Sequence, residues 1–165
     1  MKTIQLTANP LKIDTFRPFG QVLGPQNDGK AYDTEDAQLK LDGGIPRFYI
    51  MQLERKGTQF DRITRHLACT QCLGSLEGKE WLMAVAPPCE GSAPDPQQIQ
   101  AFKIPGDCFL KLEVGTWHAG PYFVTDVINL YNQERNDTKV VDHDTCKLGK
   151  TYGLSYDIVA KMALL

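Results

Sequence analysis

The sequence lacks the features that indicate a membrane, secreted or nucleic-acid-binding protein. No apolar stretch approaches the roughly 18 residues of a membrane-spanning helix, and residues 1–6 lack the apolar run of a signal peptide. The 18 Lys and Arg residues are balanced by 20 Asp and Glu residues and form no basic block. Because binding to a nucleic-acid backbone needs clustered cations, we expect no such partner. We predict a cytoplasmic protein that binds no membrane.

Cysteine is scarce and odd in number. The five Cys residues are irregularly spaced, unlike the even count of a disulfide framework, so we expect free thiols in a reducing compartment. Cys69 and Cys72 match the C-x-x-C spacing of redox and zinc sites, but the chain has no second such pair. In a strand, an offset of three places the two thiols on opposite faces. We interpret both as small buried hydrophobic side chains.

Helical periodicity is also rare, and short apolar or alternating runs separated by Gly and Pro dominate. This pattern is typical of a β-sandwich or barrel. We predict one all-β domain over residues 1–165, with few short helices. The expected strands are residues 48–53, 71–76, 80–86, 108–113 and 122–131. The expected loops are residues 24–33, 87–98 and 135–145, and the expected helices are a turn over 14–17 capped by Asp14 and a helix over 156–164 capped by Ser155.

Histidine is scarce too, but two of the three His residues lie in matched segments. His66 lies in residues 62–78 and His118 in residues 111–121. Each segment has a polar residue at a strand end, a short turn and a second polar residue that opens the next strand. Paired units of this kind bring four side chains together inside a small β-barrel, as in the cupin superfamily. His143 lies in a polar stretch, and we interpret it as a loop residue.

The two segments resemble the two parts of the cupin pattern, with substitutions at metal-binding positions. Thr64, His66 and Gln71 stand where the first part has two His and one Glu, and Glu113 and His118 lie in the second part. Two imidazoles and an amide form a weak site for a transition metal, although Glu113 would add a carboxylate. The cofactor is therefore either none or a divalent transition metal, whose ligands would be His66, Gln71, Glu113 and His118.

With these residues in view, the chain resembles the ureidoglycolate lyase family (older name ureidoglycolate hydrolase), on its plant-like and cyanobacterial-like branch. The resemblance covers most of the chain and includes residues 16–22, 47–51, 64–66, 70–75 and 115–121. It implies a cupin-like β-barrel or jelly roll, a homodimer, and a role in purine (allantoin) catabolism. It also implies a carbon–nitrogen lyase of the amidine-lyase type, which splits ureidoglycolate into glyoxylate and urea.

Three residues are candidates for the proton transfers of such a reaction. Breaking the carbon–nitrogen bond of ureidoglycolate requires a base for the hydroxyl proton and an acid for the urea leaving group. His66 and His118 are the natural pair, because imidazole titrates near neutral pH. Glu113 is a further candidate base if burial raises its pKa.

Four residues are candidates for binding this small anionic substrate. Gln71 would orient the ureido group, because an amide both donates and accepts hydrogen bonds. Arg65 or Lys111 would hold the carboxylate, and Trp117 would form a wall of the pocket. Three of them also have a purely structural interpretation. Trp117 would fill the core, and Arg65 and Lys111 would be ordinary surface charges.

Two other functions are open. One is a different cupin enzyme, such as a metal-dependent isomerase or dioxygenase, because one barrel can host many reactions. The other is a non-catalytic cupin that binds a small acid. Turnover of a ureido acid would distinguish the lyase from both.

Overall fold

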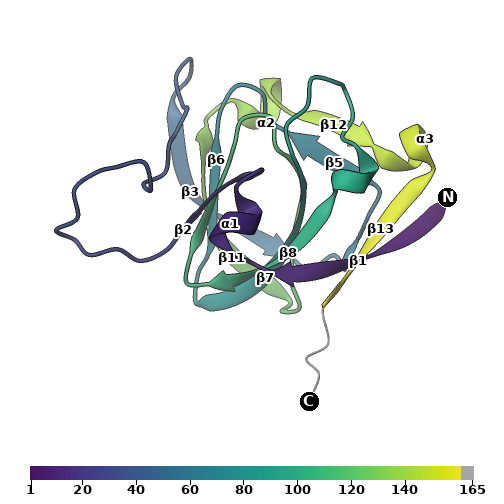
Figure 1. Ribbon diagram of the computed structural model, residues 1–165, viewed down its shortest axis with the longest axis horizontal. Coiled ribbons are helices and arrows are strands. Elements are labelled where there is room, and N and C mark those ends of the chain that lie inside the picture. Colours follow the sequence, from purple (N-terminus) through teal and green to yellow (C-terminus); the bar gives the residue numbers. More distant parts are fainter. Residues whose placement is uncertain (161–165) are drawn as a thin grey trace.

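Two curled β-sheets pack against each other in the computed structural model, which describes residues 1–160 of the chain (Figure 1). The large sheet has the strand order β12-β5-β10-β7-β8-β1-β13-β4, and the small sheet has the order β2-β9-β6-β11-β3. The few helices are short and lie in connections between strands. This arrangement confirms the all-β class with few short helices and the curled, barrel-like sheets expected from the sequence.

The strands of both sheets are short, and most are joined by tight connections. The large sheet comprises β1 (Lys2–Pro10), β4 (Gln59–Phe60), β5 (Arg62–Arg65), β7 (Gly78–Ala86), β8 (Gln100–Gly106), β10 (Trp117–Tyr122), β12 (Asp144–Lys147) and β13 (Leu154–Ala160). The small sheet comprises β2 (Gly20–Leu23), β3 (Pro46–Glu54), β6 (Gln71–Ser75), β9 (Phe109–Leu112) and β11 (Val127–Arg135). The helices are α1 (Ile13–Phe16), α2 (Thr138–Val141), α3 (Leu148–Tyr152) and the 3-10 turn η1 (Pro96–Gln98).

Strand β7 is buried on both faces. Trp81 and Met83 pack in one buried cluster with Leu130 of the small sheet. Ala84, on the opposite face of β7, packs in a second cluster with Trp117 of β10. Because side chains alternate along a strand, each face of β7 meets a different part of the core. This double burial explains why β7 is continuously apolar from Trp81 to Ala86.

Three segments that are far apart in the sequence lie side by side at one end of the large sheet. Strand β10 pairs with both β5 and β7, so that His118 lies opposite Thr64 and Val85. Strand β12 pairs with the other edge of β5, with Thr145 opposite Thr64. This strand order places the residues next to His66, His118 and His143 within one corner of the barrel.

Most of the expected strands are confirmed. Residues 48–53, 71–76, 80–86 and 108–113 coincide with β3, β6, β7 and β9 to within two residues at each end. Residues 122–131 are not one strand, because β10 ends at Tyr122 and β11 begins only at Val127. Residues 24–33 and 87–95 form the expected loops, and η1 follows over Pro96–Gln98. The prediction of a loop over 135–145 is wrong in part, because α2 and the start of β12 lie there.

The predicted C-terminal helix is wrong within the described residues. Residues Leu154–Ala160 form strand β13, which pairs in parallel with β1, and residues 161–164 of that prediction lie outside the described part of the chain. Tyr156 and Ile158 are buried, as in a period-two pattern. Ser155 caps no helix, and its hydroxyl instead forms a 2.9 Å hydrogen bond with the hydroxyl of Thr3. The free edge of β1 therefore outweighs the local helical preference.

The predicted turn near the N-terminus is present as α1, but its cap differs from the expectation. The N-cap residue is Lys12, without a capping side chain, and Asp14 instead pairs with Arg17 at 3.1 Å. None of the helices in residues 1–160 is long and apolar enough to cross a membrane. All five cysteines are free, and Cys69 and Cys72 are buried, which confirms their interpretation as core side chains.

Candidate active site

Three imidazole side chains converge at the corner where β5, β10 and β12 meet. His66 follows the last residue of β5, His118 lies on β10, and His143 precedes β12. The ring centroids are 5.0 Å apart for His66 and His118, and 5.9 Å apart for His66 and His143. Strand pairing explains this cluster, because each His stands next to residues that are paired across β5.

Backbone carbonyl groups set the tautomer of two of these rings. Nδ1 of His66 lies 2.6 Å from the carbonyl oxygen of Asp142, and Nδ1 of His118 lies 3.3 Å from that of Thr116. A carbonyl oxygen only accepts hydrogen bonds, so Nδ1 carries the proton in both rings. Nε2 of each ring is then an acceptor available to a ligand.

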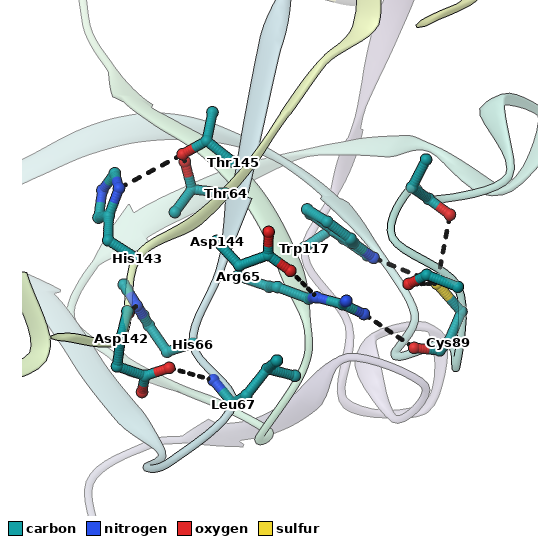
Figure 2. Close-up of polar contacts among 12 residues, drawn as sticks. Thr64, Arg65, His66, Leu67, Cys89, Trp117, Asp142, His143, Asp144 and Thr145 are labelled. Carbon is teal, nitrogen blue, oxygen red and sulfur yellow. Dashed lines mark hydrogen bonds and ion pairs between the residues drawn. The ribbon is translucent and has the colours of Figure 1, made fainter.

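The loop after His66 is held by the carboxylate of Asp142. This carboxylate accepts hydrogen bonds from the backbone N–H groups of Leu67 and Ala68 at 2.7 and 2.9 Å. Figure 2 shows the contact with Leu67 beside the ring of His66. Asp142 therefore holds both the ring, through its carbonyl, and the turn that follows it.

His118 stays uncharged at neutral pH. Its pKa falls from 6.5 to about 3, chiefly because burial disfavours the imidazolium form and next because His66 lies close by. His143 also lowers this pKa, whereas the hydrogen bond to Thr116 raises it.

The imidazole cluster lines a cavity of about 290 Å³ between the two sheets. Polar side chains make up its floor and its rim, and apolar side chains make up the rest of the wall. The polar residues are Lys56, His66, Gln71, His118, Asn132, Glu134, Lys139 and His143. A neighbouring groove of about 380 Å³ shares Lys56, His118, Gly120 and His143 with the cavity. The cavity therefore opens toward the Lys56 side.

The floor of the cavity is a hydrogen-bonded network on β3, β6 and β11. Nε2 of Gln71 donates to Oδ1 of Asn132 at 3.0 Å and to Oε2 of Glu134 at 3.2 Å. Nδ2 of Asn132 donates to Oη of Tyr49 at 3.0 Å, and Tyr49 contacts Oε1 of Glu134 at 3.5 Å. Gln71, Asn132 and Glu134 are all buried. Buried polar groups are costly unless paired, so this network requires a specific arrangement of donors and acceptors.

Comparison with protein families matches residues 3–152 to the family described as ureidoglycolate lyase. The chain belongs to the ureidoglycolate lyase family. This finding confirms the resemblance described above. A curated relative, the ureidoglycolate lyase of Azotobacter vinelandii (strain DJ / ATCC BAA-1303), is 28% identical over 133 residues, which are 68% of this chain and 74% of the relative.

Solved structures of oxalate decarboxylase are also similar to this chain. Two of them, one concerning a reaction-specificity switch and the other the Mn(II) centres of the Bacillus subtilis enzyme, match with a TM-score of 0.42 and 9% sequence identity. The matches cover 80% of this chain but 29% of each solved chain.

The structure brings together only some of the residues expected at the site of this lyase-family protein. His66, His118 and Gln71 line the cavity. Glu113 and Lys111 do not line it, and Nζ of Lys111 pairs instead with Oε2 of Glu113 at 2.5 Å. Glu113 is exposed. Lys111 is buried, but it lies on the outer face of β9, because the adjacent Leu110 and Leu112 point into the core.

Arg65 and Trp117 lie on the opposite side of β5 and β10 from the cavity. The guanidinium of Arg65 stacks on the ring of Trp117, with Cζ 4.3 Å from the ring centroid. It also donates to Oδ2 of Asp144 and to the carbonyl oxygen of Cys89, both at 2.8 Å. Figure 2 shows these groups on one side of the strand and His66 and His143 on the other. Because Arg65 and His66 are adjacent in sequence, their side chains point in opposite directions.

Sequence reasoning missed five polar residues that line the cavity: Lys56, Asn132, Glu134, Lys139 and His143. The period-two pattern of β11 contains a signal for two of them. Ile128 and Leu130 are inward and buried, and the same face continues to Asn132 and Glu134. The two lysines carry no such signal, because each lies outside a strand. His143 follows α2 and is brought in only by the pairing of β12 with β5.

The metal set expected from the sequence does not assemble. Glu113 stands outside the cavity, where it pairs with Lys111, so it cannot join His66, Gln71 and His118 around one ion. Across residues 1–160, no group of three or more His, Cys, Asp or Glu side chains is placed to hold a metal ion. The four residues expected as ligands therefore do not fit a metal centre.

Proposed function

We propose that this protein is a ureidoglycolate lyase, which splits ureidoglycolate into glyoxylate and urea during the breakdown of allantoin. The observation that carries the proposal is the pair of imidazoles His66 and His118 in a cavity with cationic side chains at its rim. Their Nε2 atoms have no hydrogen-bond partner among residues 1–160. Membership of the ureidoglycolate lyase family and the named relative support the same substrate.

The proton of the substrate hydroxyl group moves to Nε2 of His66. As the carbonyl of glyoxylate forms, the carbon–nitrogen bond breaks and the same proton passes to the nitrogen of the leaving urea, so charges and atoms balance. His118 remains neutral, because its pKa is held at about 3. It therefore does not compete with His66 for the proton, and it offers Nε2 as a hydrogen-bond acceptor to the substrate. The 5.0 Å between the two ring centroids leaves both within reach of one small ligand.

The carboxylate of the substrate binds at the rim, next to Lys56 and Lys139. Both ammonium groups lie near aromatic rings, 5.4 Å from the centroid of Tyr122 for Lys56 and 5.2 Å from that of Tyr49 for Lys139. These rings restrict the long lysine side chains near the cavity opening. The two lysines take the role that the sequence suggested for Arg65 or Lys111.

The test is the product pair formed from racemic ureidoglycolate. A lyase releases glyoxylate and urea in equal amounts, whereas an amidohydrolase would release ammonia instead of urea. We expect urea and glyoxylate at a ratio of one, and no turnover by the His66→Ala and His118→Ala variants, whose folding is checked by thermal denaturation. Full activity in either variant would refute its role.

A chelator separates the remaining functions. We expect the release of glyoxylate and urea to continue in the presence of a chelator. Loss of release with a chelator, and recovery with one divalent ion, would point to a metal-dependent cupin enzyme. Binding of ureidoglycolate without any product would point to the non-catalytic cupin.

We further propose a homodimer that forms through the outer face of β3 and β11. Phe48 and Ile50 are 63% and 55% exposed there, and Phe48 stacks on Tyr131 with centroids 5.5 Å apart. Large apolar side chains at the edge of a sheet are typical of an interface. Light scattering should give twice the monomer mass, and Phe48→Lys should give the monomer. A cytoplasmic location, supported by five free cysteines, is part of the same proposal.

A further inference from the structure

Gln71 is a cavity residue with an unpaired buried acceptor. Its side chain lines the cavity and the residue is 8% exposed. Its Oε1 atom is buried and has no hydrogen-bond partner among residues 1–160, whereas its Nε2 atom has two. A buried carbonyl oxygen without a donor is destabilising, and such atoms are uncommon in folded proteins. This atom therefore marks a position where a ligand would supply an N–H or O–H group.

The orientation of the Gln71 amide depends on Glu134. A carboxylate only accepts hydrogen bonds, so the atom 3.2 Å from Oε2 of Glu134 must be the donor Nε2. Turning the Gln71 amide around would place its oxygen against that carboxylate oxygen. It would also require the Asn132 amide to turn, so that Asn132 donates to Gln71 and accepts from Tyr49. The two amides and the Tyr49 hydroxyl can each donate or accept, whereas the carboxylate of Glu134 only accepts. Glu134 therefore fixes the direction of the hydrogen bonds in this network.

We propose that Glu134 is a positioning residue, which acts with Asn132 and Tyr49 to point Oε1 of Gln71 into the cavity as the acceptor for the terminal NH₂ of a ureido group. This inference deepens the proposed function and rests on it for the substrate class. It assigns the two ends of the substrate: the ureido NH₂ lies at the floor on β6 and β11, and the carboxylate lies at the rim near Lys56.

This assignment differs from the role expected from the sequence, in which Gln71 both donates to and accepts from the ureido group. Here the donor side of Gln71 is already used by Asn132 and Glu134. The floor therefore accepts hydrogen bonds and selects ligands that donate. Replacing the terminal NH₂ of a ligand by a methyl group would leave Oε1 of Gln71 buried and unpaired. The cost of such an unpaired group corresponds to roughly a tenfold or greater loss of affinity.

The test uses two non-reacting probes, N-carbamoylglycine and N-acetylglycine. They have the same charge and nearly the same size, and they differ in that the terminal NH₂ of the first is CH₃ in the second. We expect calorimetry on the unmodified protein to show at least about tenfold tighter binding of N-carbamoylglycine. In Glu134→Gln, the floor can reverse its hydrogen bonds, because a glutamine at this position can donate to Gln71. We expect the preference between the probes to fall to within about threefold.

The control is Glu80→Gln, which makes the same chemical change at an exposed carboxylate paired with Lys103. It should keep the full preference. The ratio of the two dissociation constants is the decisive quantity, since a merely structural defect would weaken both probes together. If Glu134→Gln does not fold, Tyr49→Phe serves instead, because it removes the hydroxyl that accepts from Asn132 and contacts Glu134. That variant should reduce the preference.

Equal binding of the two probes to the unmodified protein would overturn the inference, and so would an unchanged preference in a folded Glu134→Gln variant. These results are independent of turnover. Preferred binding of N-carbamoylglycine without release of urea from ureidoglycolate would reject the proposed lyase function and leave the ureido site standing. Release of urea and glyoxylate without a preference between the two probes would support the lyase function and reject the ureido site.

Discussion

Acidification from pH 7 to pH 5 should destabilise the protein through His118. At pH 7 this side chain is neutral in the folded and the unfolded chain. Below pH 6.5 the unfolded chain binds a proton at this residue, whereas the folded protein, with a pKa of about 3, does not. The unfolded state then binds more protons, so the free energy of unfolding falls as the pH falls from 6.5 toward 3. The stabilising contribution is fully present above pH 6.5.

The size of the effect follows from the shift. Each pH unit within the window changes the free energy of unfolding by up to about 1.4 kcal/mol, so the full shift predicts a loss of about 2 kcal/mol between pH 7 and pH 5. His118 is only partly buried and keeps some access to solvent through the cavity, so we expect about half of that loss, or about 1 kcal/mol.

The assay is urea denaturation of the chelator-treated protein at both pH values, followed by the fluorescence of the buried Trp81 and Trp117. The reference is His118→Asn, because the Asn amide can donate to the carbonyl oxygen of Thr116 as Nδ1 does. The free energy of unfolding changes between pH 7 and pH 5 in both proteins. The difference between these two changes isolates the contribution of His118 from that of the other titrating groups. Equal losses in both proteins would refute the lowered pKa of His118.

Three further predictions concern the rim, a turn and a partly buried ion pair. Lys139→Met should raise KM for ureidoglycolate about fivefold with a smaller change in kcat, since a rim charge stabilises bound substrate and transition state alike; an unchanged KM would remove Lys139 from the carboxylate site. Gly115→Ala should lower the free energy of unfolding by about 1–2 kcal/mol in urea denaturation, because Gly115 has φ +84° and an added Cβ would lie 3.2 Å from that of Pro88; an unchanged midpoint would contradict this. Asp144→Asn should lower the free energy of unfolding by about 1–2 kcal/mol in the same assay, because it removes the carboxylate from the Arg65 side chain, which is 7% exposed. A variant as stable as the unmodified protein would show that the contacts with Cys89 and Trp117 are enough to stabilise the buried Arg65 side chain.

Local sequence patterns were enough to predict that the two candidate proton-transfer histidines lie close together. His66 and His118 each follow or occupy a strand next to a turn, and their segments repeat the same strand–turn–strand plan. Local sequence patterns determine such units, because the alternation of apolar residues and the position of Gly and Pro decide where a strand starts and ends. The pairing of β10 with β5 then brings the two rings to 5.0 Å.

The side chains around these rings could not be assigned in the same way. Arg65 precedes His66 directly, and a shift of one residue along a strand reverses the direction of the side chain. Glu113 lies just beyond β9, where the strand pattern does not decide whether a side chain turns inward or outward. In the structure its carboxylate meets Lys111 on the outer face.

The segments that were misassigned were those whose conformation depends on a distant partner. Residues Leu154–Ala160 have a local pattern that fits a helix, yet they form β13 because β1 offers a parallel edge more than a hundred residues away in sequence. His143 likewise reaches the cavity only because β12 adds to β5. Strand pairs of this kind gain their stability from contacts that no window of sequence contains.

The sequence by itself therefore determined the all-β class, most strands of the small sheet and three of the cavity side chains, His66, Gln71 and His118. These depend on which face of each strand is apolar, and that is a local property. The tertiary structure alone decided that Glu134 rather than Glu113 lines the cavity, and that His143 lies beside the imidazole pair. Both depend on strand order and register, which are set by the packing of the whole chain.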